Sequence, residues 1–370
     1  MKMKRMVSIL HGCLAMALLF SMYLISEQIS KYVGVQVLGF ANSPISPVMV
    51  ALVIGFVLRN AFRLPSFLDK GISFGAKKLL RYGIVLLGLR LSVIQAQEIV
   101  VSVIPVIILC VVIGLSLPHI FNKVLHLPSS LVTLISVGTA ICGITAIAAT
   151  SESLSIKEEH TAYAITTITI FGLLGMAIYP FLSHVIFTGN SFMIGLFLGT
   201  SIHDTAQVTG AAFLYQDFYY DATVVQVATI VKLIRNTFMV VIIPGLTLLN
   251  RRYALSDVEN PQRNRDRSFK GLFPIFIIGF VAMMGVRTIG DHFFVMNSAS
   301  IFTFNNTSWN MTINFLLRIS SIFITMALAS VGLSTSVGVF KNLGFKPILV
   351  GLITTMTVGI TSCILIFLLF

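Results

Sequence analysis

Apolar runs long enough to cross a lipid bilayer are the feature that most constrains this chain. Eleven such runs can be read along its 370 residues, and short polar stretches rich in lysine and arginine separate them. A helix that spans the hydrocarbon core needs about 20 mainly apolar residues. We therefore expect an all-α polytopic membrane protein with about eleven transmembrane helices. The predicted spans cover residues 7–26, 44–58, 78–91, 99–117, 130–149, 162–186, 193–214, 222–249, 272–286, 313–334 and 348–370.

The composition excludes the soluble classes. Hydrophobic residues make up 56% of the chain and charged residues only 10%, so neither a soluble domain nor a disordered chain fits. The four cysteines lie in apolar runs without a Cys-x-x-Cys pair. We interpret them as reduced core residues and expect no metal or other cofactor. No grouping of nucleophile, base and orienting residue indicates an enzyme, although a membrane enzyme or a subunit of one stays the non-transporter alternative.

The formal charge of +12 reflects membrane topology rather than a nucleic-acid partner. With the N-terminus in the cytoplasm, 18 basic residues fall on the inner side of the membrane and 3 on the outer side. This bias follows the positive-inside rule. We predict a multi-pass protein of the bacterial inner membrane with a cytoplasmic N-terminus. The first run is interpreted as a retained helix, because no small-x-small cleavage site follows it before Glu27.

Internal repeats suggest how the spans are organised. Gly-Leu-Arg-Leu-Ser-Val at 88–93 is echoed by Gly-Leu-Ser-Thr-Ser-Val at 332–337. These segments end the third and tenth spans, which run in opposite directions, as in inverted-repeat transporters. A second pair of related segments, at 138–146 and 199–206, lies on the fifth and seventh spans. These two spans are parallel unless one of them is broken or re-entrant. We expect an N-terminal helix at 1–30, a first helical repeat at 44–186 and a second at 189–370, with a cytoplasmic linker at 250–270.

The second pair of related segments is rich in glycine and hydroxyl residues. Gly-Thr-Ala-Ile-Cys-Gly-Ile-Thr-Ala occupies 138–146, and Gly-Thr-Ser-Ile-His-Asp-Thr-Ala occupies 199–206. Small residues at membrane depth can form tight helix-packing seams. The same residues suit interrupted helices, since glycine permits the break, hydroxyls satisfy freed backbone groups and exposed helix N-termini attract anions. We favour interrupted helices and keep the seam as the alternative.

Ionisable residues inside the predicted spans mark a candidate site. Asp204 lies near the middle of the seventh span, directly after His203. A carboxylate there is costly unless it faces a cavity, pairs with a cation, carries a proton or caps a half-helix. Lys232 and Arg235 share one helical face of the eighth span. Two cations against one carboxylate leave surplus positive charge, which favours an anionic ligand, although either cation could instead neutralise Asp204 or extend to the interface.

Several of these motifs together resemble a known family. They are Leu-Arg-Asn at 58–60, Leu-Arg-Tyr-Gly at 80–83, Cys-Gly-Ile-Thr-Ala at 142–146, Ser-Ile-His-Asp-Thr-Ala-Gln-Val at 201–208 and Lys-Leu-Ile-Arg-Asn at 232–236. The chain resembles the YeiH-type bacterial inner-membrane family, described as sulfate exporters, from about residue 46 to the C-terminus. The resemblance implies kinship with sodium/proton antiporters and bile-acid symporters, hence inverted five-helix repeats with a core domain of crossed broken helices and a panel domain.

The sequence thus predicts a secondary transporter that moves a small anion, such as sulfate or a related sulfur oxyanion, by alternating access coupled to protons or sodium. The alternative is a sodium/proton antiporter in which Asp204 binds the ion. Expected partners are the anion, the coupling ion and the lipid bilayer, and a second copy of the chain is left open. The predicted ion-coupling residues are His203 and Asp204. The predicted substrate-binding residues are Gly143, Thr145, Thr200, Ser201, Thr205, Gln207, Lys232 and Arg235.

Overall fold

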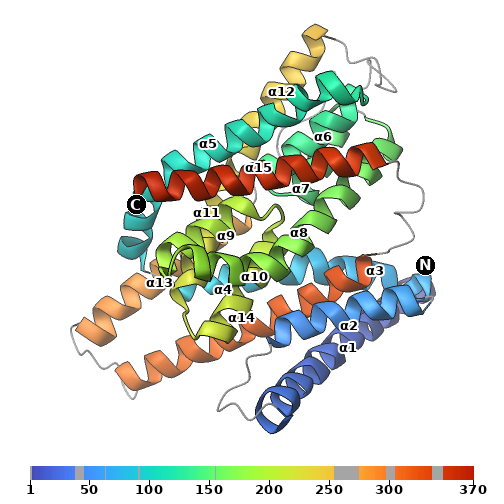
Figure 1. Ribbon diagram of the computed structural model, residues 1–370. Coiled ribbons are helices and arrows are strands. Elements are labelled where there is room, and N and C mark those ends of the chain that lie inside the picture. The colour runs from blue at the N-terminus through green and yellow to red at the C-terminus, as the bar shows by residue number, and fades with distance from the viewer. Residues whose placement is uncertain are drawn as a thin grey trace. The chain divides into compact units, whose positions relative to one another are not determined.

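The computed structural model describes residues 2–37, 46–62, 64–90, 92–154, 156–253, 275–296, 305–335 and 345–370. Regular structure in these ranges is helical (Figure 1). Most of the predicted linker, and the end of the second Gly-Leu echo, lie outside the described residues. The chain separates into two compact units, each assembled from segments of both halves of the sequence. Unit 1 comprises 1–98, 213–222 and 275–338, and unit 2 comprises 99–212, 223–274 and 339–370.

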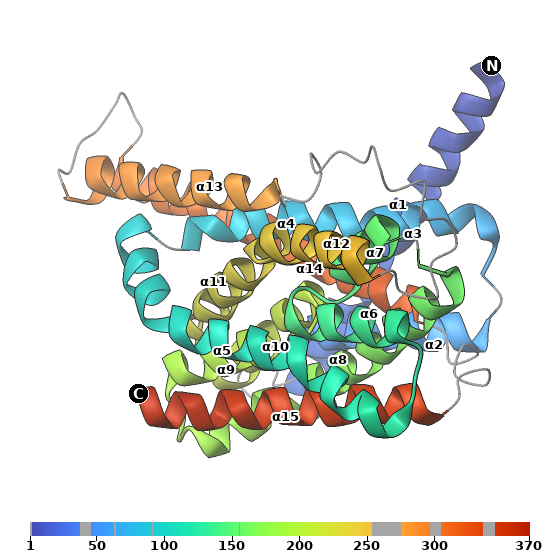
Figure 2. The same cartoon turned by 90° about the horizontal axis from the view of Figure 1, so that it is seen from above.

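Unit 2 contains the candidate site. Figures 1 and 2 show its helices, and α9 packs against both α11 and α15. Close approach of α9 and α11 depends on glycine, because a Cβ atom on Gly199 would lie 2.6 Å from a side-chain carbon of Val231. Its helices are most of α5 (Val93–Leu125), α6 (Ser129–Ala140), α7 (Ile144–Leu154), α8 (Glu158–Ile186), α9 (Ser191–Ser201), the start of α10 (Thr205–Tyr219), α11 (Thr223–Thr237), α12 (Met239–Tyr253) and α15 (Phe345–Leu369).

Unit 1 is built on glycine-mediated packing of α14 against α2. A Cβ atom on Gly55 would lie 2.4 Å from the carbonyl oxygen of Ala329, and one on Gly332 would lie 2.2 Å from that of Leu52. Such backbone approach is the usual way in which helices associate in lipid. Its helices are α1 (Lys2–Lys31), α2 (Pro47–Ala61), α3 (Asp69–Phe74), α4 (Leu80–Leu87), α13 (Phe276–Gly290) and α14 (Asn306–Ser334), with short π- or 3-10-helical segments at η1 (Tyr32–Val37), η2 (Ser66–Leu68), η3 (Gly75–Leu79), η4 (Gly88–Arg90) and η6 (Asp291–Met296).

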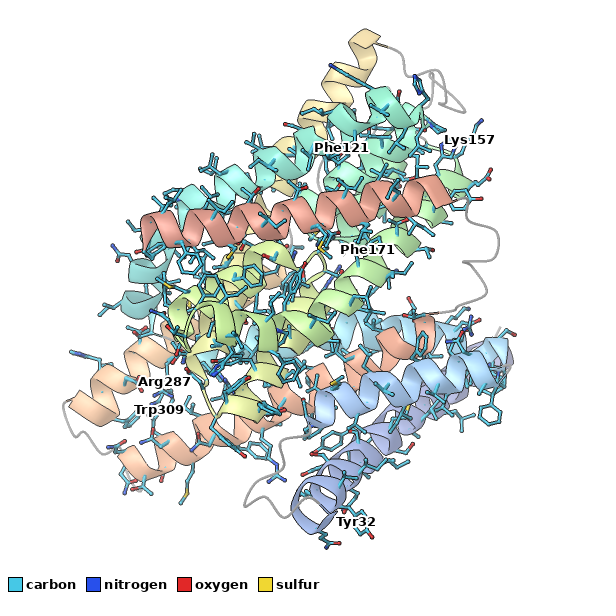
Figure 3. All side chains as sticks on the ribbon, in the orientation of Figure 1. Tyr32, Phe121, Lys157, Phe171, Arg287 and Trp309 are labelled. Carbon is cyan, nitrogen blue, oxygen red and sulfur yellow. The ribbon has the colours of Figure 1, made fainter. Side chains whose placement is uncertain are left out.

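A second contact in unit 1 joins α13, η6 and α14. Figure 3 shows Arg287 and Trp309 close together, and both bind the carboxylate of Asp291. Arg287 Nε donates to Asp291 Oδ2 at 2.6 Å and Trp309 Nε1 donates to Oδ1 at 2.9 Å. Gly290 packs against the indole of Trp309, and a Cβ atom at this position would lie 2.0 Å from the ring. One carboxylate therefore links the end of α13 to the start of α14.

The membrane class is clear, and the part of the chain that the structure describes holds fewer full-length spans than the predicted eleven. Within the described residues, seven helices are long and apolar enough to cross a membrane. The predicted runs at 130–149 and 193–214 are each split into two helices, and the run at 78–91 changes from π to α to 3-10 geometry. The seven are His11–Lys31, Ile99–Leu125, Glu159–Ile186, Thr223–Thr247, Phe276–Phe294, Asn306–Ser334 and Ile348–Leu369; Pro47–Ala61, Ser129–Ala140 and Ser191–Ser201 are shorter apolar helices.

Candidate functional site: two helix breaks that meet in unit 2

Two helix interruptions lie at the related Gly-Thr segments. α6 ends at Ala140 and α7 begins at Ile144, while α9 ends at Ser201 and α10 begins at Thr205. We call residues 141–143 and 202–204, with the four helix ends beside them, the double break. Each interruption leaves backbone carbonyls at one helix end and N–H groups at the next without partners in the helix. Such groups must be satisfied inside the protein when they lie at membrane depth.

Gly143 brings the two interruptions into contact. Its φ angle is +67°, in the left-handed region that glycine adopts without strain. A Cβ atom at this position would lie 3.1 Å from both Cα and Cβ of Asp204 and 3.2 Å from its Oδ2. Glycine is therefore required by both backbone conformation and space. As a result, the first N–H group of α7 reaches the carboxylate of Asp204.

Asp204 serves the N-termini of two helices. Its Oδ1 accepts a hydrogen bond from the N–H of Ala206 at 2.9 Å, and the N–H of Ile144 donates to the same carboxylate. In return, Gln207 Oε1 accepts from the N–H of Asp204 at 3.3 Å. This reciprocal pattern is a capping box at the start of α10. The capping role considered for Asp204 from sequence is present, and it extends to α7, which sequence spacing does not indicate.

Lys232 and Arg235, on α11, serve the C-terminal ends of the other two half-helices. Arg235 Nη2 donates to Thr139 O at 2.6 Å, and Nη1 donates to Thr200 O at 2.6 Å. Lys232 Nζ donates to Ile141 O at 2.9 Å, and also to the carbonyl of His203. Both side chains are at most 1% exposed. Each cation therefore sits where the dipoles of α6 and α9 place partial negative charge.

Each charged side chain at the double break lies beside helix ends of opposite partial charge, but the formal charges of these side chains do not sum to zero. The two helix N-termini carry partial positive charge and the two C-termini partial negative charge of the same size, so the four dipole ends roughly offset one another. Lys232, Arg235 and Asp204 then leave a formal surplus of one positive charge. Access is uneven, because Thr145 is exposed and Asp204 and Thr205 are half-buried, whereas both cations are buried. A ligand would therefore meet the N-terminal side of the double break.

His203 takes partners different from those of Asp204. Its Nδ1 lies 3.1 Å from the carbonyl oxygen of Ser201, and its Nε2 lies 2.7 Å from Thr355 Oγ1 on α15. A carbonyl only accepts, so Nδ1 carries the proton, and in the neutral ring Nε2 accepts from the Thr355 hydroxyl. The fully buried imidazole thus ties the second interruption to α15. The two predicted ion-coupling side chains are neighbours in sequence that face different helices.

The remaining predicted residues divide between the double break and its supports. Thr200 Oγ1 donates to Leu196 O at 2.7 Å and pairs with Ser362 Oγ at 2.6 Å, so it anchors α9 to α15. Ser201 is fully buried, and its hydroxyl has no hydrogen-bond partner among the described residues. Gln207 Nε2 donates to the carbonyl of Thr169 on α8 at 3.1 Å, so this side chain also joins α10 to α8.

Asn236 belongs to the site but was not among the predicted residues. Its Nδ2 donates to Thr205 Oγ1 at 3.2 Å, at the first residue of α10. The side chain is 2% exposed, and its Oδ1 has no hydrogen-bond partner in the part of the chain that the structure describes. The signal was present in the sequence, because Asn236 follows Arg235 and lies four residues after Lys232 on the same helical face. Among the described residues, no group of three or more His, Cys, Asp or Glu side chains could hold a metal ion.

These features define the class: an all-helical membrane protein with two interrupted helices whose ends are capped by a carboxylate and two buried cations. The chain belongs to the family described as Conserved hypothetical protein 698, whose model matches residues 15–351. Similar proteins include a UPF0324 membrane protein of Fusobacterium nucleatum, 30% identical over 87% of this chain and 89% of that protein. Another, from Streptococcus pneumoniae serotype 4, is 33% identical over 90% of this chain and 91% of the relative.

Proposed function

We propose that this protein is a secondary active transporter of a small anion, sulfate or a related sulfur oxyanion, that works by alternating access coupled to protons or sodium. The observation that carries the proposal is the surplus positive charge at the double break, next to two helix N-termini. Surplus charge of one sign at membrane depth is costly unless a ligand or function uses it. The absence of any recognisable catalytic grouping in the sequence favours transport over catalysis.

The charge pattern favours an anion over a cation as the cargo. A cation approaching Asp204 would be repelled by Lys232, which lies within electrostatic reach of that carboxylate. Repulsion between like charges is strong where water is scarce. An anion would instead gain attraction from both cations and hydrogen bonds from N–H groups of α7 and α10, which is the usual mode of anion binding at helix N-termini.

The proposal gives the predicted residues distinct roles. Thr145 and Thr205 would contact the anion, since they lie on the accessible side of the double break. Lys232 and Arg235 would supply positive potential through the helix ends that they cap. Gly143, Thr200, Ser201, Gln207 and His203 would shape the two interruptions, and Asp204 would couple the ion. The inverted repeats, a cytoplasmic N-terminus in the bacterial inner membrane and a homodimer are parts of the same proposal.

Flux in proteoliposomes tests the proposed function directly. Purified protein would be reconstituted into vesicles loaded with radiolabelled sulfate or thiosulfate, and efflux would be followed with and without imposed proton and sodium gradients. We expect efflux above that of protein-free vesicles, and a reduced rate in Thr145→Val relative to Thr357→Val, which replaces a threonine on α15 whose hydroxyl donates to Ile353 O of the same helix. Sodium-driven proton movement without any added anion, and no anion flux, would favour the antiporter alternative.

A further inference from the structure

The carboxylate of Asp204 occupies the place that an anionic substrate would take. It accepts hydrogen bonds from Ala206 at the start of α10 and from Ile144 at the start of α7. These N–H groups are the donors that helix N-termini offer to anions. A substrate anion and an ionised Asp204 therefore compete for the same donors and for the same surplus charge of Lys232 and Arg235.

The structure also provides a polar group that is not satisfied in this state. The amide of Asn236 is 2% exposed, and one of its ends pairs with Thr205 while the other has no partner among the described residues. A half-turn of the amide would pair its oxygen with the Thr205 hydroxyl and free its NH₂ group. That donor would then stand beside the N-terminus of α10, where a bound anion oxygen could accept from it.

Building on the proposed function, we infer that the carboxylate of Asp204 competes with the substrate anion for these N–H groups, and that binding of one proton to Asp204 ends the competition. A proton taken up from the aqueous phase neutralises the carboxylate, which weakens its hydrogen bonds with Ala206 and Ile144. The anion then takes the freed N–H groups, and the proton stays on Asp204 while the anion is bound. Anion and proton therefore bind together and cross in the same direction, one proton for each anion at this site.

The surroundings of Asp204 make it the group that titrates with the anion. Among the described residues, the other charged or titratable groups facing the double break are Lys232 and Arg235 on α11, Cys142 between α6 and α7, and His203. Lys232 and Arg235 are held by backbone carbonyls. His203 is directed to α15, and Cys142 is fully inside the fold. Only Asp204 is half-exposed and also bound to the donors that an anion needs.

Anion affinity as a function of pH tests this inference. Sulfate is the probe, with thiosulfate as a second probe, because both keep a constant charge between pH 5.5 and 8.5. Binding would be measured by calorimetry on detergent-solubilised protein. Wild-type affinity should fall with rising pH, by up to about tenfold per unit where one proton is linked to binding. Asp204→Asn should bind at least about tenfold more tightly than the wild type at pH 8.5, and independently of pH.

Two further variants keep the experiment decisive. Asp204→Ser also retains a helix-capping side chain without a carboxylate, so it should behave as Asp204→Asn does. Glu159→Gln removes an exposed carboxylate on α8 and should keep the wild-type pH dependence. Binding by the wild type that is independent of pH, or weaker binding by both Asp204 variants at pH 8.5, overturns the inference and leaves the proposed function standing. Failure of both probes to bind any of these proteins overturns the proposed function itself.

Discussion

At the scale of single residues, Arg235 shows how a buried cation can be satisfied without an acidic partner. Its guanidinium donates to carbonyls at the ends of both α6 and α9. Arginine suits this position because its planar group directs several N–H donors at once, whereas lysine offers a compact point charge. The side chain therefore holds two helix ends together and also contributes positive potential to the double break.

Replacing Arg235 should destabilise unit 2. Arg235→Gln removes most of the donors and leaves buried carbonyls unsatisfied, at a cost of roughly 1–3 kcal/mol for each such group. Arg235→Lys keeps the charge but reaches fewer carbonyls, so it should lie between the wild type and Arg235→Gln in thermal unfolding temperature. Lys78→Gln, which removes an exposed cation, is the control and should leave that temperature unchanged. Equal unfolding temperatures for all four proteins would contradict this role of Arg235.

Replacing Gly143 should weaken both the stability of the fold and sulfate binding. Gly143→Ala combines a left-handed backbone angle with contact between the new methyl group and Asp204. The left-handed conformation alone costs an alanine about 1–2 kcal/mol. We expect a lower thermal unfolding temperature and weaker sulfate binding, since the N-terminus of α7 must move away from Asp204. Gly245→Ala is the matched control, because nothing lies within 4 Å of a Cβ atom there. Unchanged sulfate binding in Gly143→Ala would count against the shared cap.

At the scale of helices, glycine decides how closely α2 and α14 pack in unit 1. Gly55 and Gly332 face each other across this contact, and each lies against backbone of the opposite helix. Any side chain would push the helices apart. The contact therefore depends on backbone approach and not on large apolar side chains, as expected for helices that associate in lipid.

Gly55→Ala should therefore weaken unit 1. A methyl group at this position would meet the backbone carbonyl of Ala329, which cannot move away as a flexible side chain could. We expect faster cleavage of the reconstituted protein by added protease and a lower thermal unfolding temperature. Gly285→Ala on α13 has open space for its methyl group and should match the wild type in both assays. If the two variants behave alike, close packing of α2 and α14 is not what stabilises unit 1.

The helix scale also shows what sequence can and cannot predict. Glycine and hydroxyl residues at 138–146 and 199–206 indicated interruptions, because these residue types are the ones that tolerate broken helices. Substrate binding by Lys232 and Arg235 stays a prediction, but sequence does not indicate that their donors meet carbonyls of Ile141 and Thr139. Every residue has a carbonyl, so side-chain patterns cannot reveal which carbonyls a buried cation will bind. Asn236 could have been found from the helical face that it shares with Lys232 and Arg235, but its partner Thr205, 31 positions away, could not.

At the scale of the whole molecule, the chain is assembled from segments that alternate between two units. Unit 1 takes up 1–98, 213–222 and 275–338, and unit 2 takes the rest. α5 and α10 therefore contribute residues to both units. The apolar composition of the long runs predicted the membrane class correctly because it is a local property of the sequence. It cannot report the assembly, because which spans pack together is decided by contacts between distant segments.

The predicted orientation can be tested on intact cells. Lys123 and Lys157 are exposed residues that the distribution of basic residues places on opposite sides of the membrane. Each would be replaced by cysteine in a protein in which Cys13, Cys110, Cys142 and Cys363 are changed to serine or alanine. A maleimide that does not cross the inner membrane should label Lys157→Cys and not Lys123→Cys. The opposite pattern would reverse the orientation.

The central claim is that the double break binds an anion, and thermal stability of the solubilised protein tests it most directly. A ligand that binds only the folded state raises the unfolding temperature by mass action, and the rise grows with the ratio of ligand concentration to Kd. The unfolding temperature would be measured with sulfate, thiosulfate, chloride or sodium at two pH values and constant ionic strength. We predict stabilisation by a sulfur oxyanion that is larger at the lower pH. Stabilisation by sodium alone, with no response to any anion, would contradict the account.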